Sequence, residues 1–227
     1  MLMHLTPTSL PRPHSLSELG LAADFDPLIG LSEFTYRRGS EIYGEKEPAE
    51  YIYQVKSGTV RSYKLLSDGR RQINAFHVPG DVFGLTYGGN HRFTAEAVAD
   101  TTLRLTKRES LTAAAENDGT LTRDLLRMTT TNLRHAEDHM LLLGRKTSME
   151  RVAAFLIEMD RRLTAAGILA LPMPRRDIAD YLGLTIETVS RSLSYLRELG
   201  VIRFIDNNQR HIVLVDKQQL AVFDRQN

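Results

Sequence analysis

With 227 residues, 42% of them hydrophobic and 25% charged, the chain has the composition of a soluble globular protein with one large core or two smaller ones. Its formal net charge of +1 does not by itself indicate nucleic-acid binding, and the absence of cysteine excludes disulfides and cysteine-ligated zinc or iron–sulfur sites. Because the chain has no run of about 18 apolar residues and its start lacks a signal-peptide pattern, we expect a cytoplasmic protein without a membrane partner.

Residues 1–32 contain several prolines and no sustained periodicity, so we expect a loose N-terminal arm. From 33 to 115 the chain alternates β-prone runs with glycine-containing turns, and the pair Asp68 and Gly69 is a strong hairpin signal. This alternation of β-prone runs and turns predicts an antiparallel β-roll. Its strands are expected near residues 51–56, 59–66, 72–78 and, as a closing run, 93–106.

Residues 116–144 show a helical pattern with two adjacent stripes, whose members lie three and four residues apart. The first stripe consists of Leu121, Leu125, Met128, Asn132, His135, His139 and Leu142. The second stripe consists of Leu126, Thr129, Leu133, Ala136, Met140 and Leu143. One stripe can pack on the β-roll while the other meets a second copy of the chain, although burial of both within one chain would also fit. We assign the first stripe to a dimer seam and leave the reverse assignment open.

Residues 145–227 begin with an amphipathic helix at 148–163 and continue with the pattern of a winged helix-turn-helix. The first helix of this motif is expected at Arg175–Leu182, because Gly183 can adopt the positive φ that ends a helix. Thr185 is a favourable N-cap for the second helix. Two β-prone runs around the turn "DNNQ" then predict a hairpin wing. The buried face of the second helix should comprise Val189, Leu193, Leu196 and Leu199.

The opposite face of the second helix carries Glu187, Ser190 and Arg191. Arginine can bond bidentately to guanine O6 and N7, glutamate can accept from cytosine N4, and a small serine permits close approach to a thymine methyl. Glu187 could instead favour the positive end of the helix dipole, or form a surface ion pair with Arg191. Because the turn, the cap and the hairpin accompany this face, we interpret it as a surface that reads DNA bases in the major groove.

In order and spacing, these features resemble the CRP/FNR family of bacterial transcription regulators over nearly the whole chain. The segments that carry the resemblance are "SGTVRSYKLLSDGRRQINAFHVPGDVFG", the long helix and "RRDIADYLGLTIETVSR". Within the family, "FHVPGDVFG" and "GRKTSMERVAAFL" look most like the FixK branch, the low-oxygen regulators of rhizobia. The resemblance implies an α+β fold with an N-terminal cyclic-nucleotide-binding-like β-roll, a long dimerisation helix and a C-terminal winged helix-turn-helix domain.

The resemblance also implies a function and residue roles. Such regulators act in the bacterial cytoplasm as homodimers, bind palindromic double-stranded DNA resembling TTGAT…ATCAA and recruit RNA polymerase as activators, here for low-oxygen, nitrogen-fixation or respiratory genes. Arg191 matches the arginine that reads the guanine, Glu187 the glutamate that reads the complementary strand, and Ser190 the serine beside the thymine methyl. Ile186 would touch a neighbouring base. The contacts to the DNA backbone would come from Arg175, Thr185, Thr188 and Arg210.

The signal-sensing residues of the family are missing. FNR-type oxygen sensing needs cysteine ligands, which this chain lacks. Cyclic-AMP binding uses a Gly-Glu pair and an Arg-Ser or Arg-Thr pair, but Leu85 stands at the glutamate position and Phe93 at the arginine position, with Arg92 one residue away. We therefore expect a regulator that needs no cofactor and is controlled by its own abundance. The alternatives are an unidentified small ligand, a haem on His77 or His91, and a metal on His135 and His139.

An enzyme is the remaining alternative class, because β-rolls also occur in metal-dependent isomerases and dioxygenases. Those sites need two histidines separated by one residue, together with a carboxylate and a third histidine. No His-x-His sequence occurs in this chain. We therefore expect no catalytic residues, and a transcription regulator is the interpretation that uses both halves of the chain.

Overall fold

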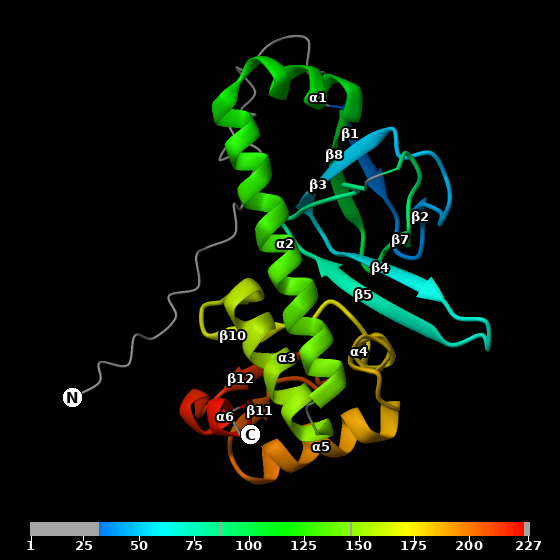
Figure 1. Cartoon of the computed structure of the whole chain (residues 1–227). Helices are drawn as coiled ribbons and strands as arrows, with labels where there is room; N and C mark the ends of the chain where they lie inside the picture. Colours follow the sequence, from blue (N-terminus) through cyan, green and yellow to red (C-terminus); the bar gives the residue numbers. More distant parts are fainter. Residues whose placement is uncertain (1–31, 87, 146, 225–227) are drawn as a thin grey trace.

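The computed structural model describes residues 32–86, 88–145 and 147–224. It confirms the expected α+β architecture, with an N-terminal β-roll, a long helix and a C-terminal domain of helices and a small sheet (Figure 1). The expected N-terminal arm lies outside the described residues, except for Ser32. Within the described ranges, no helix is both long and apolar enough to cross a membrane.

In the described part of the chain, the strands of the β-roll form two antiparallel sheets. One has the order β1 (Ser32–Tyr36), β8 (Thr101–Lys107), β3 (Tyr51–Ser57) and β6 (Val82–Phe83); the other has the order β2 (Glu41–Tyr43), β7 (Thr94–Ala97), β4 (Val60–Leu65) and β5 (Arg71–His77). The strands expected near 51–56, 59–66 and 72–78 are confirmed, and the closing run divides into β7 and β8. The short strands β2 and β6 have no expected counterpart, because two or three residues show too little alternation.

The β-roll carries the long helix on the outside of β3. Between the sheets, a core of aromatic and branched side chains includes Tyr53, Val55, Phe83 and Leu103. On the other face of β3, Ile52 joins a cluster with residues of α1 (Arg108–Asn117) and α2 (Gly119–Arg145), namely Leu111, Leu121 and Met128. Burial of this apolar cluster anchors the long helix on the β-roll.

The long helix α2 buries three of the seven residues of its first stripe within its own chain. Leu121 and Met128 pack in the cluster on β3, and Leu142 joins the core of the C-terminal domain. His139 stacks on Tyr181 of the C-terminal domain, with the ring centroids 4.2 Å apart. A side chain that is buried in its own chain cannot contact a partner, although Asn132 of this stripe is exposed. The structure therefore corrects the dimer-seam assignment of Leu121, Met128 and Leu142, which are buried in their own chain. For the half-buried Leu125, His135 and His139 and the exposed Asn132, the seam assignment stays a prediction.

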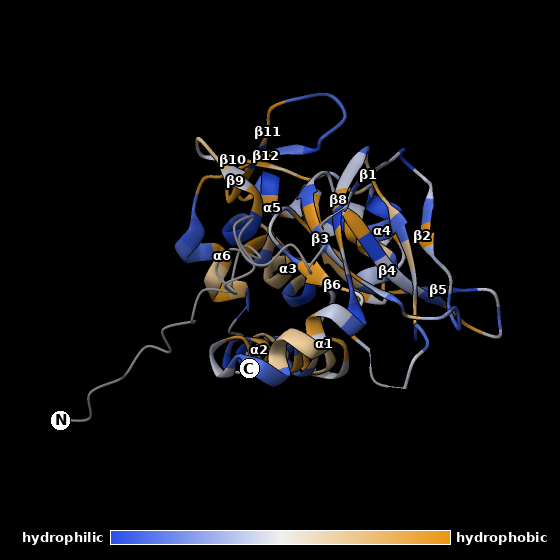
Figure 2. Cartoon of the chain, turned by 90° about the horizontal axis from the view of Figure 1, so that it is seen from above, coloured by the Kyte–Doolittle hydropathy of each residue, from blue (hydrophilic) through white to orange (hydrophobic). Residues whose placement is uncertain are grey.

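The second stripe of α2 is open to solvent except for Leu143, which packs against the core of the C-terminal domain. Leu126, Leu133 and Met140 are 66%, 58% and 65% exposed. Seen from above, α2 lies at the edge of the molecule, so one side of it faces the rest of the chain and the other faces outward (Figure 2). The second stripe is therefore the apolar face of this helix that a further chain can reach.

The C-terminal domain combines four described helices with a small antiparallel sheet. The helices are α3 (Ser148–Leu163), α4 (Arg175–Leu182), α5 (Ile186–Glu198) and α6 (Lys217–Asp224), and the sheet has the order β11 (Ile202–Phe204), β12 (His211–Leu214), β10 (Ile168–Ala170) and β9 (Thr164–Ala165). This arrangement confirms the expected amphipathic helix at 148–163, the helix-turn-helix of α4 and α5, and the wing hairpin of β11 and β12. Fully buried side chains of this core include Phe155, Met159, Leu182, Leu196 and Ile212.

Candidate nucleic-acid interface

The turn between α4 and α5 determines which face of α5 is presented to solvent. Gly183 has φ +61° and ψ +40°, and the amide of Leu184 donates to the carbonyl of Ala179 at 3.0 Å. Because an L side chain is strained in this left-handed conformation, glycine suits the position. The Thr185 hydroxyl accepts from the amide of Thr188 at 3.2 Å. Both the expected end of the first helix and the expected N-cap of the second are confirmed.

The inner face of α5 is buried against α4 and the rest of the domain. The expected members Val189, Leu193 and Leu196 are confirmed as buried. Leu199 was expected on the same face, but this expectation is wrong, because the helix ends at Glu198 and Leu199 is 41% exposed. The inner face is therefore shorter than periodicity alone predicts.

The outer face of α5 brings the predicted base-reading residues together near its N-terminus. Glu187 and Arg191 are exposed, Ser190 is half-buried, and Ile186 is 40% exposed. Hydrogen bonds from its own backbone amide and from the Thr185 hydroxyl lower the pKa of Glu187. Its carboxylate is therefore ionised at neutral pH, as an acceptor of a cytosine amino group must be. The base contacts themselves stay a prediction.

Arg175, at the start of α4, is held by two other side chains of the motif. Its Nη1 donates to the Ser190 hydroxyl at 3.0 Å, and its Nη2 donates to the side-chain oxygen of Gln209 in the wing. The guanidinium also lies 5.9 Å from the ring centroid of Phe204. In the free chain, Arg175 thus links a predicted base-reading residue to the wing. These two hydrogen bonds use two of the five N–H donors of the guanidinium, so the predicted contact with a DNA phosphate can use the others.

The other predicted backbone contacts lie at the N-terminus of α5 and in the wing. Thr185 is exposed and Thr188 is half-buried, and their hydroxyls lie 3.0 Å apart. Arg210 follows the turn of the wing, where its amide donates to Asp206 Oδ1 at 3.1 Å. Its carbonyl accepts from the amide of Leu171 at 2.9 Å, which ties the wing to the start of the motif. The contacts of these residues with phosphates stay predictions.

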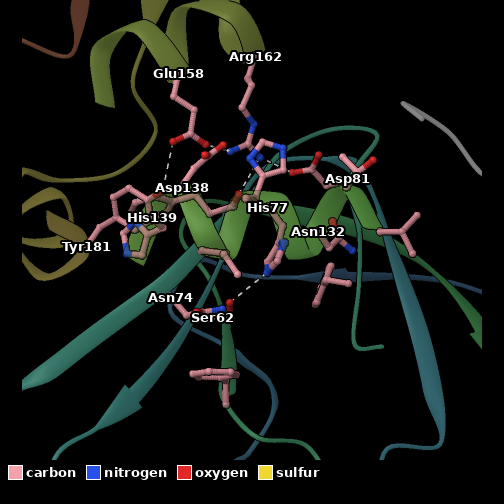
Figure 3. A pocket seen from close by; sticks show the side chains of 18 of the residues that line it. Ser62, Asn74, His77, Asp81, Asn132, Asp138, His139, Glu158, Arg162 and Tyr181 are labelled. Atoms are coloured by element: carbon pink, nitrogen blue, oxygen red, sulfur yellow. Dashed lines mark hydrogen bonds and ion pairs between the residues drawn. The ribbon is translucent and has the colours of Figure 1, made fainter. Parts of the chain in front are cut away.

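A cavity of about 860 Å³ lies where the β-roll, α2 and the C-terminal domain meet (Figure 3). Arg162 of α3 donates to Glu158 at 2.9 Å and also bonds Asp81 of the β-roll. His77 shares a 3.1 Å hydrogen bond with the Ser62 hydroxyl. Among the described residues, no group of three His, Cys, Asp or Glu side chains is placed to hold a metal ion. If the regulator is instead controlled by an unidentified small ligand, that ligand would occupy this cavity.

The two departures from the cyclic-AMP motif line this same cavity. Leu85 is 40% exposed and Phe93 is half-buried, so an apolar side chain stands at each position where a carboxylate or a cation is needed. Arg92 also lines the cavity, and its side chain is exposed. A cyclic phosphate placed here would lose water without gaining the matching charge partner.

Isothermal titration of the apo protein with cyclic AMP should therefore give no saturable heat. The physical reason is that an anion bound beside Leu85 and Phe93 would be desolvated without an oriented cation. Saturable heat with micromolar affinity would contradict the prediction. In that event, Arg92→Ala tests whether the neighbouring arginine supplies the charge.

Family models match both halves of the chain. A cyclic nucleotide-binding domain matches residues 33–118, and a Crp-like helix-turn-helix domain matches residues 150–223. The nitrogen fixation regulation protein FixK of Rhizobium meliloti (strain 1021) is 41% identical over 204 residues, which cover 90% of this chain and 92% of that protein. The protein of the same name from Azorhizobium caulinodans is 46% identical over 194 residues, covering 83% and 77%. The solved structure of FixK2 from Bradyrhizobium japonicum has 62% identity and a TM-score of 0.84, covering 88% of this chain and 100% of that one.

Proposed function

Because the chain belongs to the CRP/FNR family of transcription regulators and is similar to its FixK members, we propose that it binds a palindromic operator resembling TTGAT…ATCAA as a homodimer and recruits RNA polymerase. Its C-terminal helix-turn-helix domain is a DNA-binding domain. The observation that carries the proposal is the open outer face of α5, where an ionised glutamate and an arginine flank a small serine. That combination fits the base edges of the major groove.

The proposed base contacts come from the first two turns of α5. Arg191 would bond guanine O6 and N7, Glu187 would accept from cytosine N4, and Ser190 would approach a thymine methyl. Ile186 would add an apolar contact with a neighbouring base. The backbone contacts are assigned to Arg175, Thr185, Thr188 and Arg210, whose donors would fix the register on the phosphates.

The second stripe of α2 supports the proposed homodimer. Leu126, Leu133 and Met140 recur every seven residues, which is the spacing of one seam position in a coiled coil. Thr129, Ala136 and Leu143 occupy the intermediate seam positions. Pairing with the same stripe of a second copy would remove the exposed side chains from water. A two-fold dimer also suits a palindrome, because each α5 then meets one half-site.

We propose further that the protein needs no cofactor to bind its operator. The lack of cysteine and the apolar side chains of Leu85 and Phe93 support this, because they remove the charge partners and ligands that known family signals need. The proposed targets are low-oxygen, nitrogen-fixation or respiratory genes of a bacterial cytoplasm, in keeping with the names of the FixK relatives. Largely exposed loops of the β-roll at 45–50 and 67–70 are the proposed polymerase contacts.

Fluorescence anisotropy with the purified, metal-free protein tests this function directly. With no effector added, the protein should bind a TTGAT…ATCAA duplex more tightly than a scrambled duplex of the same length, by about 10³-fold or more at physiological salt. Weak, unselective binding would contradict cofactor independence. If a cell extract then restores selectivity, the cavity between the domains holds a ligand and the gated alternative is correct.

A further inference from the structure

The β4–β5 hairpin of the β-roll reaches the first helix of the helix-turn-helix (Figure 1). Arg61 of β4 donates to Asp177 of α4 at 2.5 Å. Arg71 of β5 donates to Asp180 through Nε at 2.9 Å and through Nη2 at 2.7 Å. Arg71 also bonds Asp177, so Asp177 pairs with both arginines and Asp180 pairs with Arg71. These ion pairs between Arg61, Arg71, Asp177 and Asp180 are called the hairpin clamp below.

The hairpin clamp is largely shielded from water. The side chain of Asp177 is 2% exposed, and those of Arg61 and Arg71 are 15% and 19% exposed. Glu96 of β7 holds the other side of the Arg61 guanidinium at 2.5 Å. Salt screens such pairs less than surface pairs, and separation of the partners would leave a buried charge without compensation. The clamp therefore opposes any movement of α4 away from the hairpin.

The position of α4 in turn determines the position of α5. Ile178 and Leu182 of α4 belong to the same packed cluster as Val189 and Leu193 of α5. Only residues 183–185 separate the two helices, and their buried faces pack in one cluster, so a shift of α4 would displace α5 as well. The hairpin itself belongs to the domain on which α2 is anchored. The clamp thus connects the helix that faces DNA to the domain that carries the dimer seam.

We propose that Arg61, Arg71, Asp177 and Asp180 are positioning residues for operator binding, which hold the two α5 helices of a dimer at the separation of the two half-sites. The inference rests on the proposed dimer and palindrome. It assigns to internal ion pairs the task of orienting the DNA-binding domains. A chain with this clamp has its recognition helices in place without any bound ligand.

The test compares Arg71→Ala with the matched control Arg70→Ala. Arg70 is the neighbouring arginine of the same hairpin, but its side chain is 78% exposed and pairs with Asp68 in the turn. Full-length variants are titrated by anisotropy against the palindrome, a single half-site, and palindromes with two base pairs added to or removed from the spacer. Arg71→Lys and Asp180→Asn serve as milder variants, and circular dichroism verifies that each protein is folded.

Arg71→Ala should bind the palindrome roughly ten-fold or more weakly, because domains without a fixed separation engage the second half-site at a lower effective concentration. Its affinity for a single half-site should stay within about two-fold of the wild type, since the helix-turn-helix is unchanged. Its affinity should also depend less on spacer length than the affinity of the wild type does. Arg71→Lys should keep part of the preference for the natural spacer, and Arg70→Ala should match the wild type in all of these DNA-binding measurements, which contain no RNA polymerase.

The half-site and spacer measurements separate positioning from a general loss of structure. An unchanged spacer preference in both Arg71→Ala and Asp180→Asn would overturn the proposed positioning role of the clamp. Equal losses on the palindrome and the half-site would also overturn it, because that pattern indicates less folded or less competent protein. If the wild type itself does not prefer the palindrome to scrambled DNA, the proposed function fails, and the role of the clamp fails with it.

Discussion

Replacing Arg191 with alanine should leave a folded dimer that binds DNA with a much weaker preference for its operator. Arg191 is exposed on α5, so its removal leaves the core of the helix-turn-helix intact. One bidentate arginine–guanine pair contributes about 1–3 kcal/mol of discrimination. A palindrome contains the pair twice, so the operator preference should fall by about 2–6 kcal/mol, which is roughly 30-fold to more than 10,000-fold.

Arg197→Ala is the matched control for this variant. Arg197 lies further along the same helix, its side chain is 49% exposed, and its removal deletes the same charge from each chain. Anisotropy on operator and scrambled duplexes at two salt concentrations separates base reading from phosphate attraction, because the latter weakens as salt rises. If the two variants show the same ratio of operator to scrambled affinity, Arg191 does not read a base.

Replacing Leu133 with aspartate should convert the protein to a monomer. Leu133 is the central member of the second stripe and is 58% exposed in the single chain, so the change does not disturb the core of the chain. In a coiled-coil seam, however, it would bury two carboxylates against apolar neighbours, which is strongly unfavourable. Sedimentation equilibrium should then report the single-chain mass of 25.6 kDa. Operator affinity should fall to that of one half-site.

Arg134→Asp introduces the same side chain at the next residue of α2. Residue 134 is exposed but lies outside both stripes, so its variant should remain dimeric and bind the operator. A dimeric Leu133→Asp protein would place the dimer interface elsewhere. Unfolding of that variant, seen by circular dichroism, would instead mean that Leu133 contributes to the monomer core.

Local signals in the sequence predicted the helix-turn-helix well. Gly183 and Thr185 act through the backbone of their immediate neighbours, and the structure confirms both roles. The assignment of Leu121, Met128 and Leu142 to a dimer seam was wrong for a different reason. Periodicity shows that two faces are apolar, but the face that packs inward depends on residues such as Ile52, far away in the chain.

The contacts that join separate parts of the chain could not be predicted from local patterns. Arg71 and Asp180 are 109 residues apart, and Arg175 and Gln209 are 34 apart. Each of these residues is charged or polar, and nothing in the neighbouring sequence distinguishes it from an ordinary surface residue. Only the fold brings such residues together, whereas capping and turn residues carry their own geometric signature.

The bridge from Arg175 to Ser190 and Gln209 affects how the protein meets the wrong DNA. In the free chain, the Ser190 hydroxyl and the side-chain oxygen of Gln209 already accept hydrogen bonds from Arg175. At a matching site, the proposed base contact of Ser190 would replace its hydrogen bond with Arg175, and a phosphate would become the partner of Arg175. A mismatched site would offer the phosphate alone, which the remaining N–H groups of Arg175 can reach while its hydrogen bonds with Ser190 and Gln209 persist. The protein would then slide along non-matching DNA under electrostatic attraction. The hydrogen bond between Arg175 and Ser190 would break only at sites whose bases replace it.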